Sequence, residues 1–181
     1  MASTASTSTP TAALREPDAP APALPPRSLA VVRIVLGWVF LWSFLDKTFG
    51  LGYSTPDGQA WIDGASPTAG FLASRDGSFG ELFRNMSDQA WSEWLFMGGM
   101  AGLGIALTLG IGLRLAAIGG TVLMASMWMS MLPLKDNPIV DVHVFYMVAM
   151  IALAITSAGD RWGLGRWWKD LGLVRRLPIL R

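Results

Sequence analysis

The sequence predicts an all-α integral membrane protein: a bundle of four transmembrane helices with one long loop at its outer end. Of its 181 residues, 52% are apolar and only 15% are charged, a composition typical of membrane proteins. Four stretches stay apolar for about 20 residues, the length that a helix needs to cross a ~30 Å hydrocarbon core. The chain is long enough for one such bundle and too short for a second soluble domain.

The four predicted spans cover about residues 28–49, 93–112, 114–133 and 138–158. The stretches 94–113 and 115–134 carry no charged residue, whereas the first span contains Arg33. A charge at this depth is costly in lipid. Two explanations remain open: Arg33 reaches the nearby membrane edge with its long side chain, or it contacts protein or water inside the bundle.

The segments outside the spans differ in composition. Residues 1–27 are rich in Ser, Thr, Ala and Pro and predict a disordered cytoplasmic tail. Residues 50–92, the outer loop, alternate apolar clusters with turn residues, which predicts short helices lying at the membrane interface. Ser66 followed by Pro67 predicts a helix start there. The loop acts either as a lid over a site or as a cover that only meets lipid.

Small residues recur every four positions in the second span and predict close helix packing. They are Gly98, Gly102, Ala106 and Gly110, and a shorter row, Ala116 and Gly120, follows in the third span. Small residues in such rows let two membrane helices approach closely. We therefore expect the second and third spans to form a tight hairpin.

Charge predicts the orientation of the chain. Ten Lys and Arg residues fall on the side of the two termini and four on the other side, so both termini are expected in the cytoplasm of a cell with this protein in its plasma membrane. The basic segment 169–181 is expected to lie against the anionic inner leaflet. A net charge of +1 gives no sign of a nucleic-acid partner. The absence of cysteine excludes disulfides, thiolate chemistry and Cys-bound iron–sulfur clusters in this chain.

Charged residues collect at the predicted outer ends of the spans: Asp46, Lys47, Glu93, Lys135, Asp136, Asp141 and His143. At a common depth they would form a ring that binds a small anion through Lys47 and exchanges protons through His143, because an imidazole changes charge near neutral pH. The same residues would also serve as interfacial salt bridges. Asn137 and Pro138 predict the start of the fourth helix, with Asp141 in its first turns. One histidine cannot supply both ligands of a b-type haem, and we expect no bound metal.

Several motifs, in this order and spacing, carry a family resemblance: FLWSFLDKTFGLG, AWIDGASPTAGFL, LTLGIGLRLAA, NPIVDVHVFY and AGDRWGLGRWW. Over about residues 29–168 the chain resembles the DoxX/DoxD family of small bacterial membrane proteins. The resemblance to the DoxD branch implies the large subunit of a thiosulfate:quinone oxidoreductase, which joins two thiosulfates into tetrathionate, reduces quinone and works with a small second subunit. Much of the family has a Glu where this chain reads MGGMAGLG.

Two functions are compatible with these observations. In the first, the chain is a quinone-linked oxidoreductase subunit that acts on thiosulfate, a small anion, without a covalently bound cofactor. Its candidate catalytic residues are Lys47, Asp46, Arg33, Asp141 and His143, and its candidate quinone contacts are Trp38, Trp42 and Phe44. In the second, the chain is a non-catalytic scaffold or assembly partner for other redox proteins and docks them through its outer loop.

Overall fold

The structure is a computed structural model that describes residues 24–181, all of whose regular elements are helices. The predicted all-α membrane bundle is therefore confirmed. The predicted tail, residues 1–27, falls almost entirely outside the described residues, and Arg27 already opens the first helix.

Four long helices form the body of the protein: α1 (Arg27–Phe49), α4 (Ala90–Leu109), α5 (Leu113–Ser130) and α6 (Val142–Ile155). The first three are long and apolar enough to cross a membrane, whereas α6 is apolar but has only 14 residues. The outer loop contains η1 (Trp61–Asp63), α2 (Ala69–Ala73) and α3 (Gly80–Arg84). After α6 the chain forms η2 (Ala158–Asp160), α7 (Gly165–Asp170), α8 (Gly172–Arg176) and η3 (Pro178–Leu180).

Two polar side chains decide where α6 begins, and they place its start later than the expected residue 138. Asn137 does not cap the helix, because its Oδ1 accepts hydrogen bonds from the backbone of Ile139 and Val140, both at 2.9 Å, and closes a turn. Asp141 is the N-cap and accepts from the backbone N–H of His143 at 3.0 Å. In the outer loop, Ser66 Oγ accepts from Ala69 N at 3.0 Å, but α2 begins at Ala69 with Thr68 as its N-cap, two residues later than expected.

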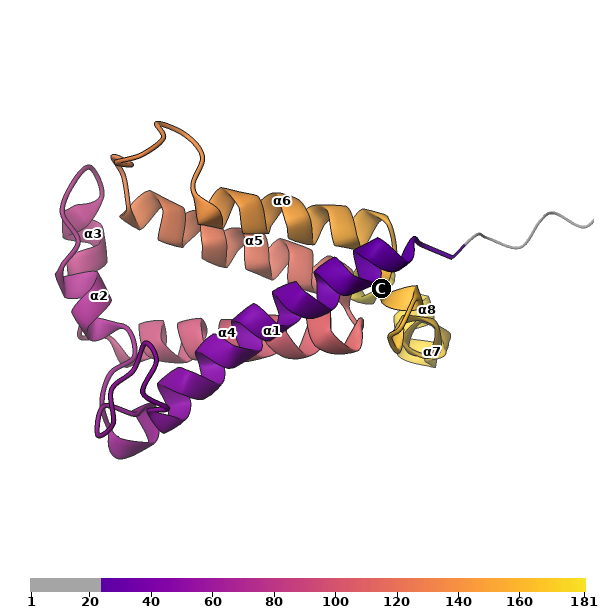
Figure 1. Cartoon of the computed structure of the whole chain (residues 1–181), viewed down its shortest axis with the longest axis horizontal. Helices are drawn as coiled ribbons and strands as arrows, with labels where there is room; N and C mark the ends of the chain where they lie inside the picture. Colours follow the sequence, from indigo (N-terminus) through magenta and orange to yellow (C-terminus); the bar gives the residue numbers. More distant parts are fainter. Residues whose placement is uncertain (1–23) are drawn as a thin grey trace, which may run out of the picture.

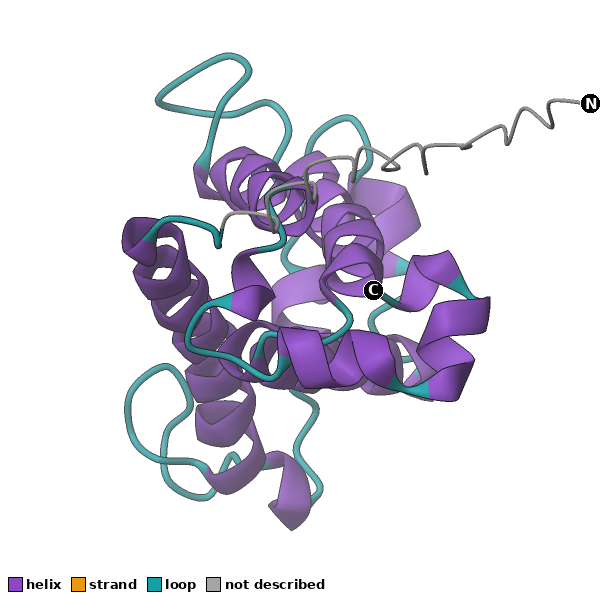
Figure 2. Cartoon of the chain, turned by 90° about the vertical axis from the view of Figure 1, so that its right-hand side faces the viewer, coloured by secondary structure: helices purple, strands orange, loops and turns teal. Residues whose placement is uncertain are grey.

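The long helices pack as two pairs, α1 with α4 and α5 with α6 (Figure 1). The pairs lie close together at the end that carries α7 and α8, called the α7 end here, which Figure 2 shows face on. They diverge toward the opposite end, where α2 and α3 lie across the opening. The buried core runs between the pairs and includes Phe40, Leu103, Leu107, Met124, Met150 and Leu153.

Helices α1 and α4 approach each other closely, and a glycine of each helix lies against the backbone of the other. A Cβ on Gly37 would lie 2.6 Å from the backbone nitrogen of Thr108, and a Cβ on Gly104 would lie 2.7 Å from Cα of Leu41. Each helix thus supplies one glycine and one larger residue, four positions apart. Without a side chain at these glycines, dispersion contacts between the two backbones replace the missing hydrophobic driving force in lipid.

The predicted tight hairpin of α4 and α5 is wrong. A Cβ on Gly98 or Gly102 would meet nothing within 4 Å, so this part of the small-residue row faces open space. Close approach falls instead to Gly104 against α1, and to Gly120, which packs against Met150 of α6. The reason is that α4 packs mainly on α1 and α5 mainly on α6. Helices α4 and α5 meet through larger side chains instead, with Leu103 against Gly120 and Leu123 against Gly99.

Arg33 holds the α7 end of the bundle together. Its side chain is fully buried, at 0% exposure, so protein encloses the guanidinium. The guanidinium donates hydrogen bonds to the carbonyls of Leu107 and Thr108 at the end of α4, the latter at 2.8 Å. It also donates to Trp162 O at 2.9 Å and Arg161 O at 3.3 Å, in the turn that follows η2. Arg33 therefore contacts protein, the second of the two explanations.

These contacts complete the hydrogen bonding at the end of α4. A helix leaves its last four carbonyls without partners and carries partial negative charge there. Ala106 O accepts from Gly110 N, Leu109 O accepts from Leu164 N, and Arg33 takes the two carbonyls between them. Arg33 forms no ion pair with any of residues 24–181, so carbonyl dipoles rather than a carboxylate stabilise its charge.

We predict that Arg33→Gln lowers the free energy of unfolding by about 3 kcal/mol or more, because buried carbonyls lose a charged donor. The free energy of unfolding of Arg33→Lys should lie between those of the unaltered chain and Arg33→Gln, because one ammonium cannot donate both to the α4 carbonyls and to the turn after η2. The measurement is unfolding of the full chain in detergent micelles. Arg27→Gln is the control, because Arg27 is an exposed arginine on the same helix. If both Gln variants lowered the free energy of unfolding equally, the stabilising role of the buried Arg33 contacts would be contradicted.

Two glycines of α4 provide a matched pair for the packing. Gly104→Ala should destabilise the protein by about 1–3 kcal/mol, because the new methyl group meets the α1 backbone. Gly102→Ala should leave stability unchanged or raise it by about 0.5–1 kcal/mol, since Ala favours helix and the site is open. The same unfolding assay compares them. If Gly102→Ala were the more harmful change, α4 would pack on its other face.

Candidate functional site

A cavity of about 340 Å³ lies beneath the outer loop, where the two helix pairs diverge. We call it the outer cavity. Helices α2 and α3 form its roof, and the first turns of α4 and the last turns of α5 form its walls. Its apolar lining includes Phe71, Leu72, Phe83, Leu95, Phe96 and Met127. Leu72 and Phe83 are buried although each belongs to a helix of only five residues, because α2 and α3 turn these side chains toward the bundle.

Two polar groups in the outer cavity lack partners among residues 24–181. Lys47 is half-buried and forms no hydrogen bond or ion pair with these residues. The Thr68 side chain is 6% exposed and its Oγ1 has no hydrogen-bond partner. A buried hydroxyl without a partner is costly. By contrast, the hydroxyl groups of Ser92, Ser126 and Ser130 each donate to the backbone carbonyl three residues earlier in the chain.

Asp46 holds the beginning of the outer loop. Its carboxylate is fully buried and accepts hydrogen bonds from Tyr53 N at 3.2 Å, Ser54 N at 3.0 Å and Ser54 Oγ at 2.6 Å. These contacts fold residues 50–55 back onto the end of α1. The adjacent Lys47 therefore has a fixed backbone position at the edge of the outer cavity, and the contacts of Asp46 are those of a positioning residue.

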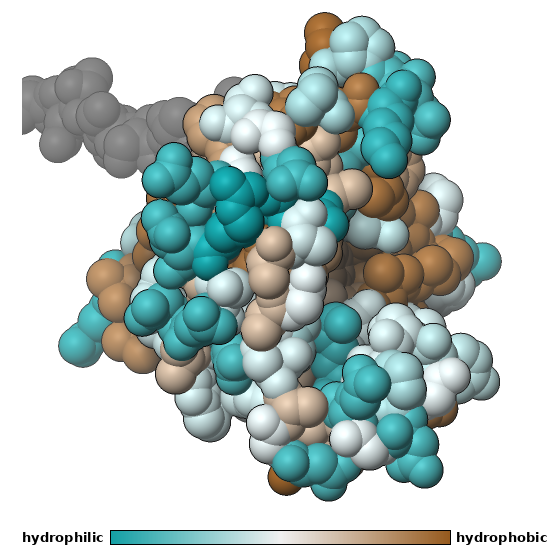
Figure 3. All heavy atoms as spheres, turned by 90° about the vertical axis from the view of Figure 1, so that its left-hand side faces the viewer, coloured by the Kyte–Doolittle hydropathy of each residue, from teal (hydrophilic) through white to brown (hydrophobic). Residues whose placement is uncertain are grey.

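The outer cavity continues into a groove along α4 and α5. Met86, Leu95, Leu123 and Ser126 line both. The groove has a volume of about 840 Å³ and an almost wholly apolar lining, and Gly98, Gly102 and Gly119 form part of its wall. Seen from the outer-loop end, apolar residues border one side of a recess, and more polar residues border the other (Figure 3). A ligand with a polar head and an apolar tail matches this sequence of surfaces.

His143 and Asp141 lie in a second cavity, called the charged cavity here, of about 880 Å³. Their side chains interact directly, with His143 Nδ1 at 2.6 Å from Asp141 Oδ2. Burial raises the pKa of the Asp141 carboxyl, but hydrogen bonds from His143 and Val144 and the charge of His143 outweigh it and hold that pKa below its usual range. Arg75 and Lys135 line the same cavity.

The predicted ring of outer charges is thus divided. Asp46 and Lys47 lie at the end of α1, with Lys47 in the outer cavity, and Asp141 and His143 line the charged cavity. No hydrogen bond or ion pair among the described residues joins the two groups. Ser130 lines both cavities, so they adjoin at the end of α5.

The remaining predicted site residues lie elsewhere. Trp38 and Trp42 stack on the surface of α1, with ring centroids 5.7 Å apart, and Trp42 meets Tyr53 at 5.1 Å. Phe44 packs against the core. None of the three lines the outer cavity, and Arg33 lies at the α7 end. Sequence reasoning missed Thr68 and Phe83, whose only signal was the apolar and turn pattern of the outer loop.

Comparison with known proteins identifies the family. The DoxX family profile matches residues 28–132, more than half of the chain. The match covers α1, the outer loop, α4 and α5, which together supply nearly all of the outer cavity and the groove. No curated protein and no solved structure compared with the chain matches it. The protein is a member of the DoxX family of membrane proteins.

Proposed function

We propose that this protein is a quinone-linked redox subunit in which the outer cavity binds the head group of a membrane quinone. The observation that carries the proposal is the combination of an apolar cavity, two unpartnered polar groups, Lys47 and Thr68, and a groove that leads away along α4 and α5. A volume of about 340 Å³ is within the range of small-molecule sites. The ring would occupy the cavity and the isoprenoid tail the groove.

The polar groups suit a quinone. Lys47 and Thr68 each offer a hydrogen-bond donor, and a quinone presents two carbonyl oxygens that only accept. Reduction places negative charge on these oxygens, so a nearby ammonium and hydroxyl stabilise the reduced ring more than the oxidised one. This site replaces Trp38, Trp42 and Phe44 as the proposed quinone contacts, because those three residues lie outside the cavity.

Quinone reduction needs two electrons and two protons. In the thiosulfate reaction, two thiosulfate ions each lose one electron and join through a new S–S bond as tetrathionate, while the quinone becomes quinol. His143, hydrogen-bonded to Asp141 in the adjoining cavity, is the proposed proton carrier. Among the described residues that line the outer cavity, Lys47 alone carries a positive charge, whereas thiosulfate is a dianion. We therefore propose that thiosulfate binds outside it, at a surface shared with a second redox subunit.

Quinone binding tests the first part of the proposal. Lys47→Gln and Thr68→Val should each raise the Kd of a short-chain ubiquinone analogue, Lys47→Gln by about tenfold, because a hydrogen bond to a charged group is lost. The measurement is titration of the purified full chain in detergent, read by tryptophan fluorescence. Lys135→Gln, a lysine of the charged cavity, should bind as the unaltered chain does. Equal binding by all four proteins would contradict the assignment.

Turnover tests the second part. Membranes containing the chain should show thiosulfate-dependent quinone reduction that membranes without it lack, and His143→Gln should lower the rate at least tenfold. His143→Gln should leave the Kd of the quinone analogue unchanged, because His143 does not line the outer cavity. Quinone binding without any thiosulfate-dependent reduction would refute thiosulfate as the electron donor and retain the quinone site.

A scaffold role is the second candidate, favoured by apolar side chains that the outer loop exposes. Tyr53 is 78% exposed and Ile62 is 64% exposed. Such residues are suited to a protein partner or to lipid. If the chain neither binds quinone nor supports turnover, and Ile62→Ser abolishes co-purification of a redox enzyme, the scaffold role would replace the quinone proposal.

A further inference from the structure

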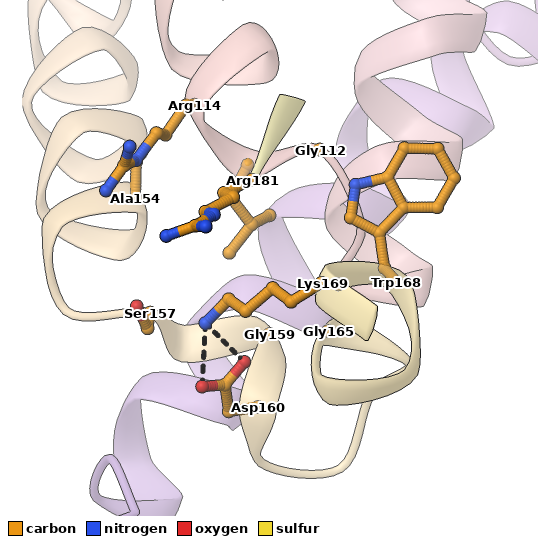
Figure 4. Close-up of a pocket in the computed structure, with 12 residues that line it drawn as sticks. Gly112, Arg114, Ala154, Ser157, Gly159, Asp160, Gly165, Trp168, Lys169 and Arg181 are labelled. Atoms are coloured by element: carbon orange, nitrogen blue, oxygen red, sulfur yellow. Dashed lines mark hydrogen bonds and ion pairs between the residues drawn. The ribbon is translucent and has the colours of Figure 1, made fainter. Parts of the chain in front are cut away.

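A small cavity lies at the α7 end, separate from the outer cavity and the charged cavity. It has a volume of about 140 Å³ and is called the basic cavity here. Its walls come from four parts of the chain: the turn at Gly110 and Gly112 with the start of α5, the end of α6 with η2, α7, and Arg181. Figure 4 shows its lining.

Positive charge dominates this cavity. Arg114, Lys169 and Arg181 line it, and among the described lining residues Asp160 is the one with an acidic side chain. Lys169 Nζ lies 2.7 Å and 2.8 Å from the two oxygens of Asp160, so these two charges compensate each other. The charges of Arg114 and Arg181 remain. In Figure 4 the side chains of Arg114, Arg181 and Lys169 come from three parts of the chain, and Lys169 reaches Asp160.

The fold fixes this arrangement. Arg114 N donates to Arg181 O and Arg114 Nη1 donates to Pro178 O, both at 2.9 Å. Trp168 Nε1 donates to Leu180 O at 2.5 Å. The segment after α8 is therefore held against the first turn of α5 and against α7. The other N–H groups of the Arg114 guanidinium, and the whole Arg181 guanidinium, donate to no atom of residues 24–181.

We infer that the basic cavity binds a phosphate group, as carried by an anionic phospholipid head group or by free phosphate. Two guanidinium groups with unused donors form charge-assisted hydrogen bonds to phosphate oxygens. The N-terminus of α5, with Leu113 in the cavity wall, adds partial positive charge. Trp162 and Trp167 are each 59% exposed near this end, as is typical of residues at the membrane interface. This inference does not depend on the proposed function.

Lipid binding by the purified full chain tests the inference. Native mass spectrometry should show phosphatidylglycerol bound at least tenfold more tightly than phosphatidylcholine. Arg181→Gln should reduce that affinity about tenfold, and Arg114→Gln with Arg181→Gln should reduce it further, because each change removes a charged donor. Arg166→Gln is the matched control: it removes an exposed arginine of α7 that does not line the basic cavity, and should change the affinity less than twofold.

Inorganic phosphate distinguishes the two sources. If phosphate alone raises the unfolding temperature of the unaltered chain but not of Arg181→Gln, the cavity accepts free phosphate. If only phosphatidylglycerol does so, the ligand is a lipid head group. The inference fails if neither binds preferentially, or if Arg166→Gln weakens lipid binding as much as Arg181→Gln. Arg181→Gln should leave the fold intact, because the hydrogen bonds of Arg181 to residues 24–181 are made by its backbone.

Discussion

A buried guanidinium that serves helix carbonyls organises this bundle. Arg33 lies on α1 and donates hydrogen bonds to the last carbonyls of α4 and to the turn after η2, so one side chain joins three parts of the chain. Burying a charge in a membrane protein is tolerable only where dipoles or charges stabilise it. Here the carbonyls of Leu107 and Thr108, at the negative end of the α4 dipole, do so. Glycine makes the approach possible, because a Cβ on Gly110 would lie 2.9 Å from Arg33 Nη1.

The contacts of Arg33 at the α7 end also affect the opposite end of the protein, where the outer cavity lies. The helix pairs are held together at the α7 end, and because α4 packs mainly on α1 and α5 mainly on α6, the pairs diverge toward the other end. The divergence leaves the space that α2 and α3 roof as the outer cavity. Asp46 completes the arrangement, because its buried carboxylate holds the loop that begins the roof. The buried charges at the two ends of α1 thus shape the cavity without lining it.

The two ends of the bundle differ in chemistry. The outer cavity has a mostly apolar lining with one ammonium, and one of its hydroxyl groups lacks a partner, which suits a neutral ring with carbonyl oxygens. The basic cavity carries two uncompensated guanidinium groups, which suits an anion. The two proposed ligands differ accordingly: a quinone that diffuses within the membrane, and a phosphate group carried by a lipid head group or free in solution. A protein with both sites would be positioned by lipid at one end while its redox chemistry takes place at the other.

Residue types along the chain were enough to predict the fold class and the first three spans, because hydropathy and span length depend on residues close together in the sequence. The sequence also marked Arg33, Lys47 and His143 as residues needing explanation. Tertiary structure alone decided their partners. Gly98 and Gly104 are both glycines of α4, yet of these two only Gly104 contacts α1. Thr68 becomes part of a site only because α2 covers the bundle. Which helices pair depends on contacts between residues distant in the sequence, and no local pattern records them.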